Sequence, residues 1–124
     1  MGSPETPGLE TTQLLKGVLD AVVMAVLADH DGYGYDVVRR LRLAGLAEIA
    51  DASVYGTLRR LFAQGLLSSY VVPSEGGPHR KYYGLTPLGA KALESQRSGW
   101  LSFSATVQNI LLGTATTPYE GAPT

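Results

Sequence analysis

Apolar residues recur at helical spacing in four stretches of the chain, and a short strand-like stretch separates the third from the fourth. From Gln13 the run LLKGVLDAVVMAVLAD predicts a first helix that is apolar over more than half of its girth. A helix of this kind is covered on two sides, and we expect one side to face the core and the other a second subunit. Residues 30–32 break this pattern, Tyr33–Ala44 resumes it as a second helix, and residues 45–50 form a linker.

The third predicted helix, Asp51–Leu67, has two faces of different character. Its apolar positions lie within about 80° of one another: Val54, Leu58, Leu61, Phe62 and Gly65. The opposite face is slim and edged by Arg59 and Arg60. We expect Asp51 or Ser53 to cap its start and Gly65 to end it in a left-handed turn. This shape fits a DNA major groove, which is about 12 Å wide; taken alone, however, the stretch is better explained as a surface helix with two solvated arginines.

After Leu67 the hydrophobic period shortens towards two. Residues 68–72 read as a strand, residues 73–78 as a turn and residues 80–85 as a returning strand. Three helices followed by a hairpin is the winged-helix plan, in which the third helix enters the major groove and the hairpin lies along the backbone. The expected fold class is therefore mainly α (α+β): a winged helix-turn-helix with a two-stranded wing and a long C-terminal dimerisation helix.

The last predicted helix begins with Thr86 as N-cap and Pro87 in the first turn, and it runs to about Leu112. At about 39 Å it overhangs so small a domain. Leu93, Gln96, Trp100, Phe103, Val107 and Ile110 step alternately by three and four residues, as in a seam for a partner helix. The expected dimerisation residues are Leu15, Leu19, Leu93, Val107, Ile110 and Leu111. The alternative is that this face packs on its own domain.

These elements divide the chain into a flexible tail (1–12), a winged-helix DNA-binding domain (13–86), a C-terminal dimerisation helix (87–113) and a second flexible tail (114–124). Both tails are rich in Gly, Pro and Thr and carry no hydrophobic period.

The positive charge of the chain is concentrated in one segment. The net charge is −1, yet seven basic and three acidic residues between Arg39 and Lys81 give that segment +4 and leave −5 for the rest. Modest, salt-sensitive DNA affinity is the expected consequence.

Composition narrows the function classes. The chain has no cysteine, which excludes disulfides and thiolate metal sites, and we expect no cofactor or metal. Because no apolar run reaches 18 residues and no secretory signal is recognisable, we expect a cytoplasmic protein without a membrane partner. The two histidines, His30 and His79, lie in predicted loops, and no catalytic set is brought together by spacing; we therefore expect no enzyme.

The run RKYYGLTPLG (Arg80–Gly89), together with ASVYGTLRRLFAQGLL before it and the Gly34-Tyr35 start of the second helix, resembles the PadR family of bacterial transcriptional regulators over about residues 14–112. The resemblance implies a winged-helix homodimer that binds a palindromic operator on the bacterial chromosome, usually represses, and often releases DNA when a small phenolic or planar molecule binds. Two positions depart from the family pattern: Gly56 replaces a frequent proline, and Gly84 replaces a longer residue, which we expect to thin the wing strand.

The short length resembles the smaller PadR subfamily, in which a tryptophan of the C-terminal helix lines a pore between subunits and stacks flat ligands. Trp100 matches that residue, and Gln96 and Phe103 on the same seam complete the expected effector site for an aromatic or cationic molecule. Packing of Trp100 in the core or the dimer seam is the alternative.

The expected DNA-contacting residues lie on the second helix, the third helix and the wing: Tyr35, Ser53, Tyr55, Gly56, Thr57, Arg59, Arg60, His79, Arg80 and Lys81. A buried tyrosine with a satisfied hydroxyl is an equal alternative for Tyr35. The rival function is a winged helix that binds a small molecule or a protein and has no DNA role.

Overall fold

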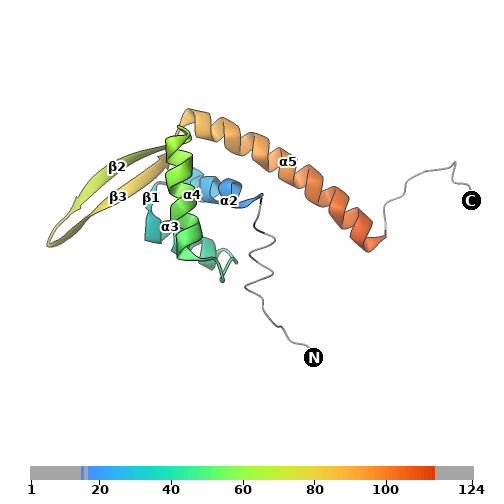
Figure 1. Cartoon of the computed structure of the whole chain (residues 1–124), viewed down its shortest axis with the longest axis horizontal. Coiled ribbons are helices and arrows are strands. Elements are labelled where there is room, and N and C mark those ends of the chain that lie inside the picture. The colour runs from blue at the N-terminus through green and yellow to red at the C-terminus, as the bar shows by residue number, and fades with distance from the viewer. Residues whose placement is uncertain (1–14, 16, 114–124) are drawn as a thin grey trace, which may run out of the picture.

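The core of the protein lies where three helices meet the base of a three-stranded antiparallel sheet. In the computed structural model, which describes Leu15 and residues 17–113, the helices are α2 (Leu19–Asp29), α3 (Gly34–Leu43) and α4 (Asp51–Ala63). The strands are β1 (Gly32–Tyr33), β2 (Leu67–Ser74) and β3 (Gly77–Leu85), and the chain then enters α5 (Pro87–Leu112). The wing formed by β2 and β3 and the helix α5 project from opposite ends of the helical core (Figure 1). Both predicted tails lie outside the described residues.

The first predicted helix is interrupted at Gly17, since Leu15 is helical and Gly17 and Val18 form a turn. Gly17 has a φ of +89°, and α2 begins only at Leu19, with Val18 as its N-cap residue. A left-handed backbone at Gly17 cannot continue a right-handed helix, so the prediction of an unbroken helix from Gln13 is wrong. The two-sided pattern is present in α2, where one side is buried in the core and Leu19, Val22 and Val26 are half-buried at its edge.

The sheet has one strand more than the sequence predicts. Gly32 and Tyr33 pair with Tyr83 and Tyr82, which places β1 beside β3 in the order β1-β3-β2. A two-residue strand carries no periodicity, and only its pairing partner defines it. The predicted turn at residues 73–78 is also shorter in the structure, because both strands extend into it and leave only Glu75 and Gly76 at the tip.

Helix α4 is rotated slightly from the predicted orientation. Its buried side chains are Val54, Thr57, Leu58 and Leu61, whereas Phe62 is 44% exposed. The expectation that Phe62 is an inner residue is therefore wrong. The predicted side-chain cap is also absent, because Ala50 occupies the N-cap and Asp51 binds Arg42 at 2.6 Å. The left-handed ending at Gly65 is confirmed by its φ of +80°.

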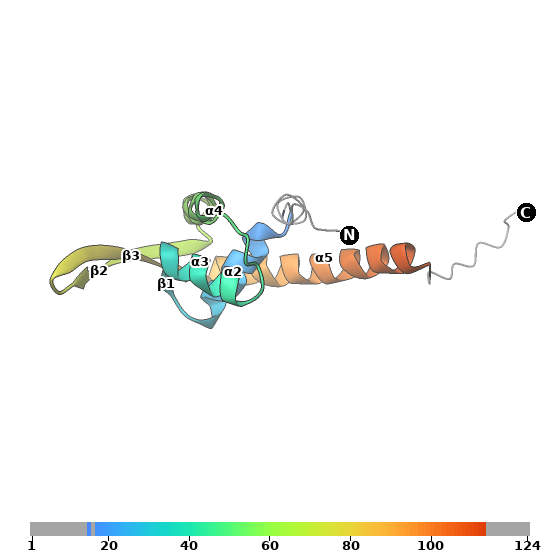
Figure 2. The same ribbon diagram turned by 90° about the horizontal axis from the view of Figure 1, so that it is seen from below.

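Helix α5 begins as predicted and then leaves the core. The Thr86 hydroxyl accepts a hydrogen bond from the Gly89 amide at 3.0 Å, and Pro87 occupies the first turn. Leu93 is only 5% exposed and belongs to the core of its own chain, which corrects its assignment to a dimer contact. Beyond it, Ile110 is 65% and Leu111 78% exposed, so the described residues do not cover the far part of the seam. Figure 2 shows α4 end-on, to one side of the line that runs from the wing to α5.

Candidate nucleic-acid interface

An open groove of about 460 Å³ lies between the start of α3, the outer side of α4 and strand β3. Five of the residues expected to contact DNA line it: Tyr35, Tyr55, Arg59, Arg80 and Lys81. The same groove is lined by Tyr33, Gly34, Leu58 and Tyr83. Residues from three separate elements are thus brought to one surface, as the winged-helix plan requires.

The first wall of the groove depends on a close approach between α3 and α4. A Cβ atom at Gly34 would lie 2.7 Å from Cε1 of Tyr55, so a side chain there would displace the Tyr55 ring. Gly34 therefore lets the phenol lie directly against the start of α3. Tyr35, the next residue, is 50% exposed, so the packing alternative for it does not hold within the described residues.

The second wall carries two neighbouring cations on opposite faces of β3. The Arg80 guanidinium lies 4.5 Å from the centroid of the Tyr33 ring, and the Lys81 ammonium lies 5.5 Å from that of Phe62. Consecutive strand residues point to opposite faces, so the two charges flank the strand. Neither of them, nor Arg59 on the facing helix, forms an ion pair with an acidic side chain of residues 17–113. These three charges are therefore available to an external anion.

The other arginines of the basic segment are neutralised within the chain. Arg39 and Arg40 both bind Asp36, at 2.8 and 2.9 Å, and Arg42 binds Asp51. Arg40 is 16% exposed and also donates to the backbone carbonyls of Val26, His30 and Asp31. The sum of +4 for this segment therefore overstates the positive charge that its surface presents.

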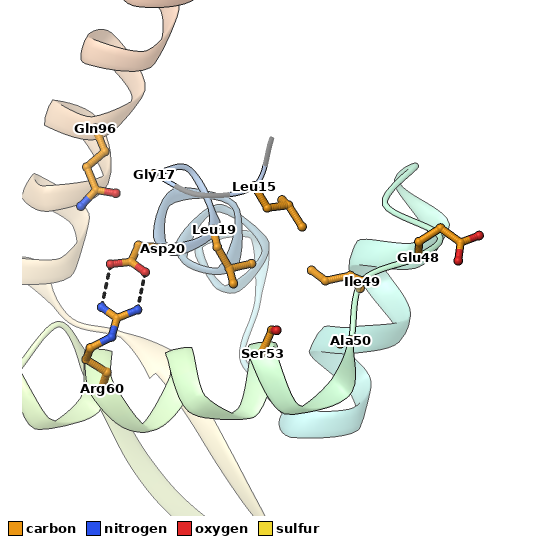
Figure 3. Close-up of a pocket in the computed structure, with 10 residues that line it drawn as sticks. All are labelled: Leu15, Gly17, Leu19, Asp20, Glu48, Ile49, Ala50, Ser53, Arg60 and Gln96. Atoms are coloured by element: carbon orange, nitrogen blue, oxygen red, sulfur yellow. Dashed lines mark hydrogen bonds and ion pairs between the residues drawn. The ribbon is translucent and has the colours of Figure 1, made fainter. Parts of the chain in front are cut away.

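Arg60 differs from its neighbour Arg59. Its guanidinium donates two hydrogen bonds to the carboxylate of Asp20 on α2, at 2.7 and 2.9 Å (Figure 3). These hydrogen bonds, and then the charge of Asp20, raise the pKa of Arg60 above its usual value. Of the two neighbouring arginines, Arg60 is therefore neutralised by Asp20, whereas Arg59 has no acidic partner among residues 17–113.

The Asp20–Arg60 pair lines a second pocket, of about 510 Å³, between α2, α4, the preceding linker and α5 (Figure 3). Ser53 and Gln96 also line it, together with Leu15 and Leu19. Ser53 is two helical turns from Arg60, so both occupy the side of α4 that faces this pocket. Neither residue lines the groove, and their DNA contacts stay predictions.

Three other predicted contacts have distinct environments. Thr57 is only 4% exposed, and this burial contradicts its predicted contact with DNA. At Gly56 the position of a Cβ atom is open, with nothing within 4 Å. His79 is exposed on the wing, outside the groove lining.

The predicted effector residues are not gathered into one pocket by the described chain. Trp100 and Phe103 lie on α5 with ring centroids 6.3 Å apart and are 43% and 62% exposed, whereas Gln96 lines the second pocket. Sequence patterns indicate neither Tyr33 and Phe62 as partners of the wing cations nor Asp20 as the partner of Arg60. No local pattern could reveal Asp20, because forty residues separate it from Arg60.

Within residues 17–113, four helices, a three-stranded antiparallel sheet and the cationic groove define a winged-helix protein with a long C-terminal helix. A family model described as the transcriptional regulator PadR-like family matches residues 23–95. The chain therefore belongs to the PadR-like family of transcriptional regulators, as its motifs predict, and the coarse function is that of a DNA-binding regulator.

Solved structures agree with this assignment. A PadR-like transcriptional regulator from Bacillus cereus is 33% identical, with 80% of this chain and 96% of that chain covered and a TM-score of 0.71. A PadR family regulator from Eggerthella lenta is 31% identical, covers 83% of this chain and 89% of that chain, and has a TM-score of 0.75. An uncharacterised protein of Lysinibacillus sphaericus is 26% identical over 91 residues, 72% of this chain and 84% of that protein.

Among the described helices, none has the length and apolarity needed to cross a membrane.

Proposed function

We propose that the protein is a homodimeric, cytoplasmic repressor that binds a palindromic operator through α4 and the wing and releases it when a small aromatic molecule binds. The observation that carries the DNA-binding part is the charge distribution at the groove. Arg59, Arg80 and Lys81 converge there from two elements without acidic partners in the described chain, while Arg39, Arg40, Arg42 and Arg60 are each paired. Unpaired cations around an exposed helix favour a polyanion over a neutral partner.

The far part of α5 supports the dimer. Trp100, Phe103, Val107, Ile110 and Leu111 share one face of the helix, and four of these side chains are between 43% and 78% exposed. A continuous apolar stripe of this size on an isolated helix marks a protein contact. A second copy meeting the same face through a two-fold axis would cover both stripes at once and would present two α4 helices about 34–36 Å apart, one turn of DNA.

The aromatic pair on that face supports the effector. Trp100 and Phe103 expose π-surface at the start of the stripe that the second copy covers, so a planar molecule inserted between the subunits would contact both rings. Such a ligand weakens operator binding only if it binds the free dimer more tightly than the DNA-bound dimer. Repression follows if the operator overlaps a promoter.

DNA binding is tested with duplexes selected by the protein from a random-sequence library, followed by fluorescence anisotropy over a salt series. Arg59→Ala is expected to weaken binding about 5- to 100-fold and to reduce the salt slope by about one phosphate contact. Lys91→Ala removes the same charge from an exposed α5 position outside the groove and is expected to leave affinity within about twofold. Equal affinities for the two variants would refute the proposed groove, and no salt-dependent binding to any duplex would favour the rival function without DNA.

The effector is tested through Trp100, the single tryptophan of the chain. Titration with planar aromatic molecules should change its fluorescence and release the selected duplex at the same ligand concentrations. Saturating fluorescence changes with unaltered duplex affinity would refute the coupling and leave the DNA-binding site standing.

A further inference from the structure

Three tyrosines form an aromatic ladder across the outer face of the sheet. Tyr33 on β1 lies opposite Tyr82 on β3, which in turn lies opposite Tyr70 on β2. The ring centroids are 5.5 Å apart between Tyr33 and Tyr82 and 5.7 Å apart between Tyr82 and Tyr70. Paired residues of neighbouring strands point to the same face, so the three rings connect all three strands on the side of the sheet away from the core.

One end of the ladder is fastened to the loop between α2 and β1. The Tyr70 hydroxyl donates a hydrogen bond of 2.5 Å to Oδ2 of Asp31. A hydrogen bond to a carboxylate is stronger than one to a neutral acceptor. The same bond, followed by burial and the charge of Asp31, raises the pKa of Tyr70 above its usual value of 10.0.

Gly84 makes this hydrogen bond possible. A Cβ atom at position 84 would lie 2.6 Å from Oδ1 of Asp31 and 3.0 Å from its Cγ and Oδ2. Gly84 is two residues from Tyr82 and shares its face of β3. The absence of a side chain therefore lets the Asp31 carboxylate lie against the strand and reach across to Tyr70.

The other end of the ladder carries a cation of the candidate interface. The Arg80 guanidinium lies 4.5 Å from the centroid of Tyr33, and both residues line the groove. A free arginine side chain has many rotamers, and an aromatic ring beneath the guanidinium restricts them. Less side-chain entropy is then lost when the guanidinium contacts an anion. Since Asp31 directly precedes β1, its bond to Tyr70 holds the strand that carries the Tyr33 ring.

We propose that Asp31, Tyr70 and Gly84 form a wing latch that positions Arg80 for contact with a DNA phosphate. Asp31 and Tyr70 are positioning residues in this scheme, and Arg80 is the residue that touches DNA. The latch rests on the proposed DNA-binding function and adds to it the set of contacts that fixes the wing cation before DNA arrives. Its energetic consequence is preorganisation, because the ordering of Arg80 occurs on folding rather than on binding.

The test measures anisotropy of a labelled 30-base-pair duplex, selected by the parent protein from a random library, between 50 and 300 mM salt. Tyr70→Phe keeps the ring and removes the donor, and it is expected to weaken binding about 3- to 10-fold. The slope of its log affinity against log salt should become shallower, towards that of Arg80→Ala, by up to about 0.9 for the loss of one phosphate contact. Asp31→Asn and Asp31→Ala remove the same charge, but asparagine retains a carbonyl acceptor. The alanine variant is therefore expected to bind more weakly than the asparagine variant.

Combined variants separate positioning from general loss of structure. Tyr70→Phe should have no further effect in the Arg80→Ala background, and Gly84→Ala, which displaces the carboxylate, should have none in the Asp31→Ala background. If the role were merely structural, each substitution would lower affinity as much in its variant background as in the parent protein, and the salt slope would be unchanged. That result, or parent-like affinity and slope for Tyr70→Phe, would overturn the latch while parent binding remained salt-dependent. Absence of such binding by the parent would overturn the proposed function itself.

Discussion

An added methyl group at Gly89 should destabilise the fold, because the backbone of Leu66 occupies the space that the methyl would need. In the structure the Gly89 amide is bound by the Thr86 hydroxyl, and α5 starts in direct contact with the chain that leaves α4. A Cβ atom at position 89 would overlap the backbone oxygen of Leu66 and lie 2.7 Å from Cδ1 of Leu85. The methyl of Leu85 can rotate away. The carbonyl of Leu66 cannot, because it accepts a hydrogen bond from the Thr86 amide at 3.1 Å.

The cost of Gly89→Ala follows from these contacts. The start of α5 must move by about 1 Å to restore an ordinary contact distance. Overpacking of this kind costs about 1–3 kcal/mol, and losing the Thr86–Leu66 hydrogen bond adds about 1 kcal/mol. The higher helix propensity of alanine returns about 1 kcal/mol. We therefore expect a net destabilisation of about 1–3 kcal/mol, although the substitution favours the helix locally.

The assay is urea unfolding followed by circular dichroism at one fixed protein concentration, because dimer stability depends on concentration. Gly56→Ala is the matched control: it is the same substitution inside α4, where nothing lies within 4 Å of the added atom. It should raise the free energy of unfolding by up to about 1 kcal/mol. If Gly89→Ala proved as stable as the parent protein, the inferred contact between α5 and Leu66 would be wrong.

Three further predictions concern other contacts. Arg40→Met leaves three backbone carbonyls without their donor and should lower the free energy of unfolding by about 2–4 kcal/mol in the same urea assay, whereas Arg39→Met, which breaks an exposed pair, should cost less than about 1 kcal/mol. Ile110→Glu should weaken the dimer by at least about tenfold in sedimentation equilibrium, and an unaltered dimer would exclude this face of α5. In the difference between the alkaline absorbance titrations of the parent and Tyr70→Phe, Tyr70 should titrate above pH 10.0. The hydrogen bond from Tyr70 to Asp31 should be present below pH 10.0 and lost as the pH rises through the raised pKa of Tyr70. Asp31→Asn should lower that pKa.

Much of the fold was predictable because its signals are local. Hydrophobic periodicity located α3, α4 and α5. Two helix boundaries were also predicted correctly from neighbouring residues: the start of α5 from Thr86 and Pro87, and the end of α4 from Gly65. The motif around Arg80–Gly89 was specific enough to indicate the family that the comparison with its model confirms. These features depend on helix geometry and backbone freedom, which neighbouring residues decide among themselves.

Only the tertiary structure decided which polar residues are available for function. Arg59 and Arg60 are equivalent in the sequence, but Asp20, forty residues away, occupies one of them. Gly84 was expected to thin the wing, whereas the structure fills its place with the Asp31 carboxylate. Thr57 lies in the core because α4 is rotated by its packing on α2 and α3. The sequence by itself determined α3, α4, α5, the wing hairpin and the family; long-range contacts, which no periodicity encodes, decided β1 and the charge and geometry of the interface.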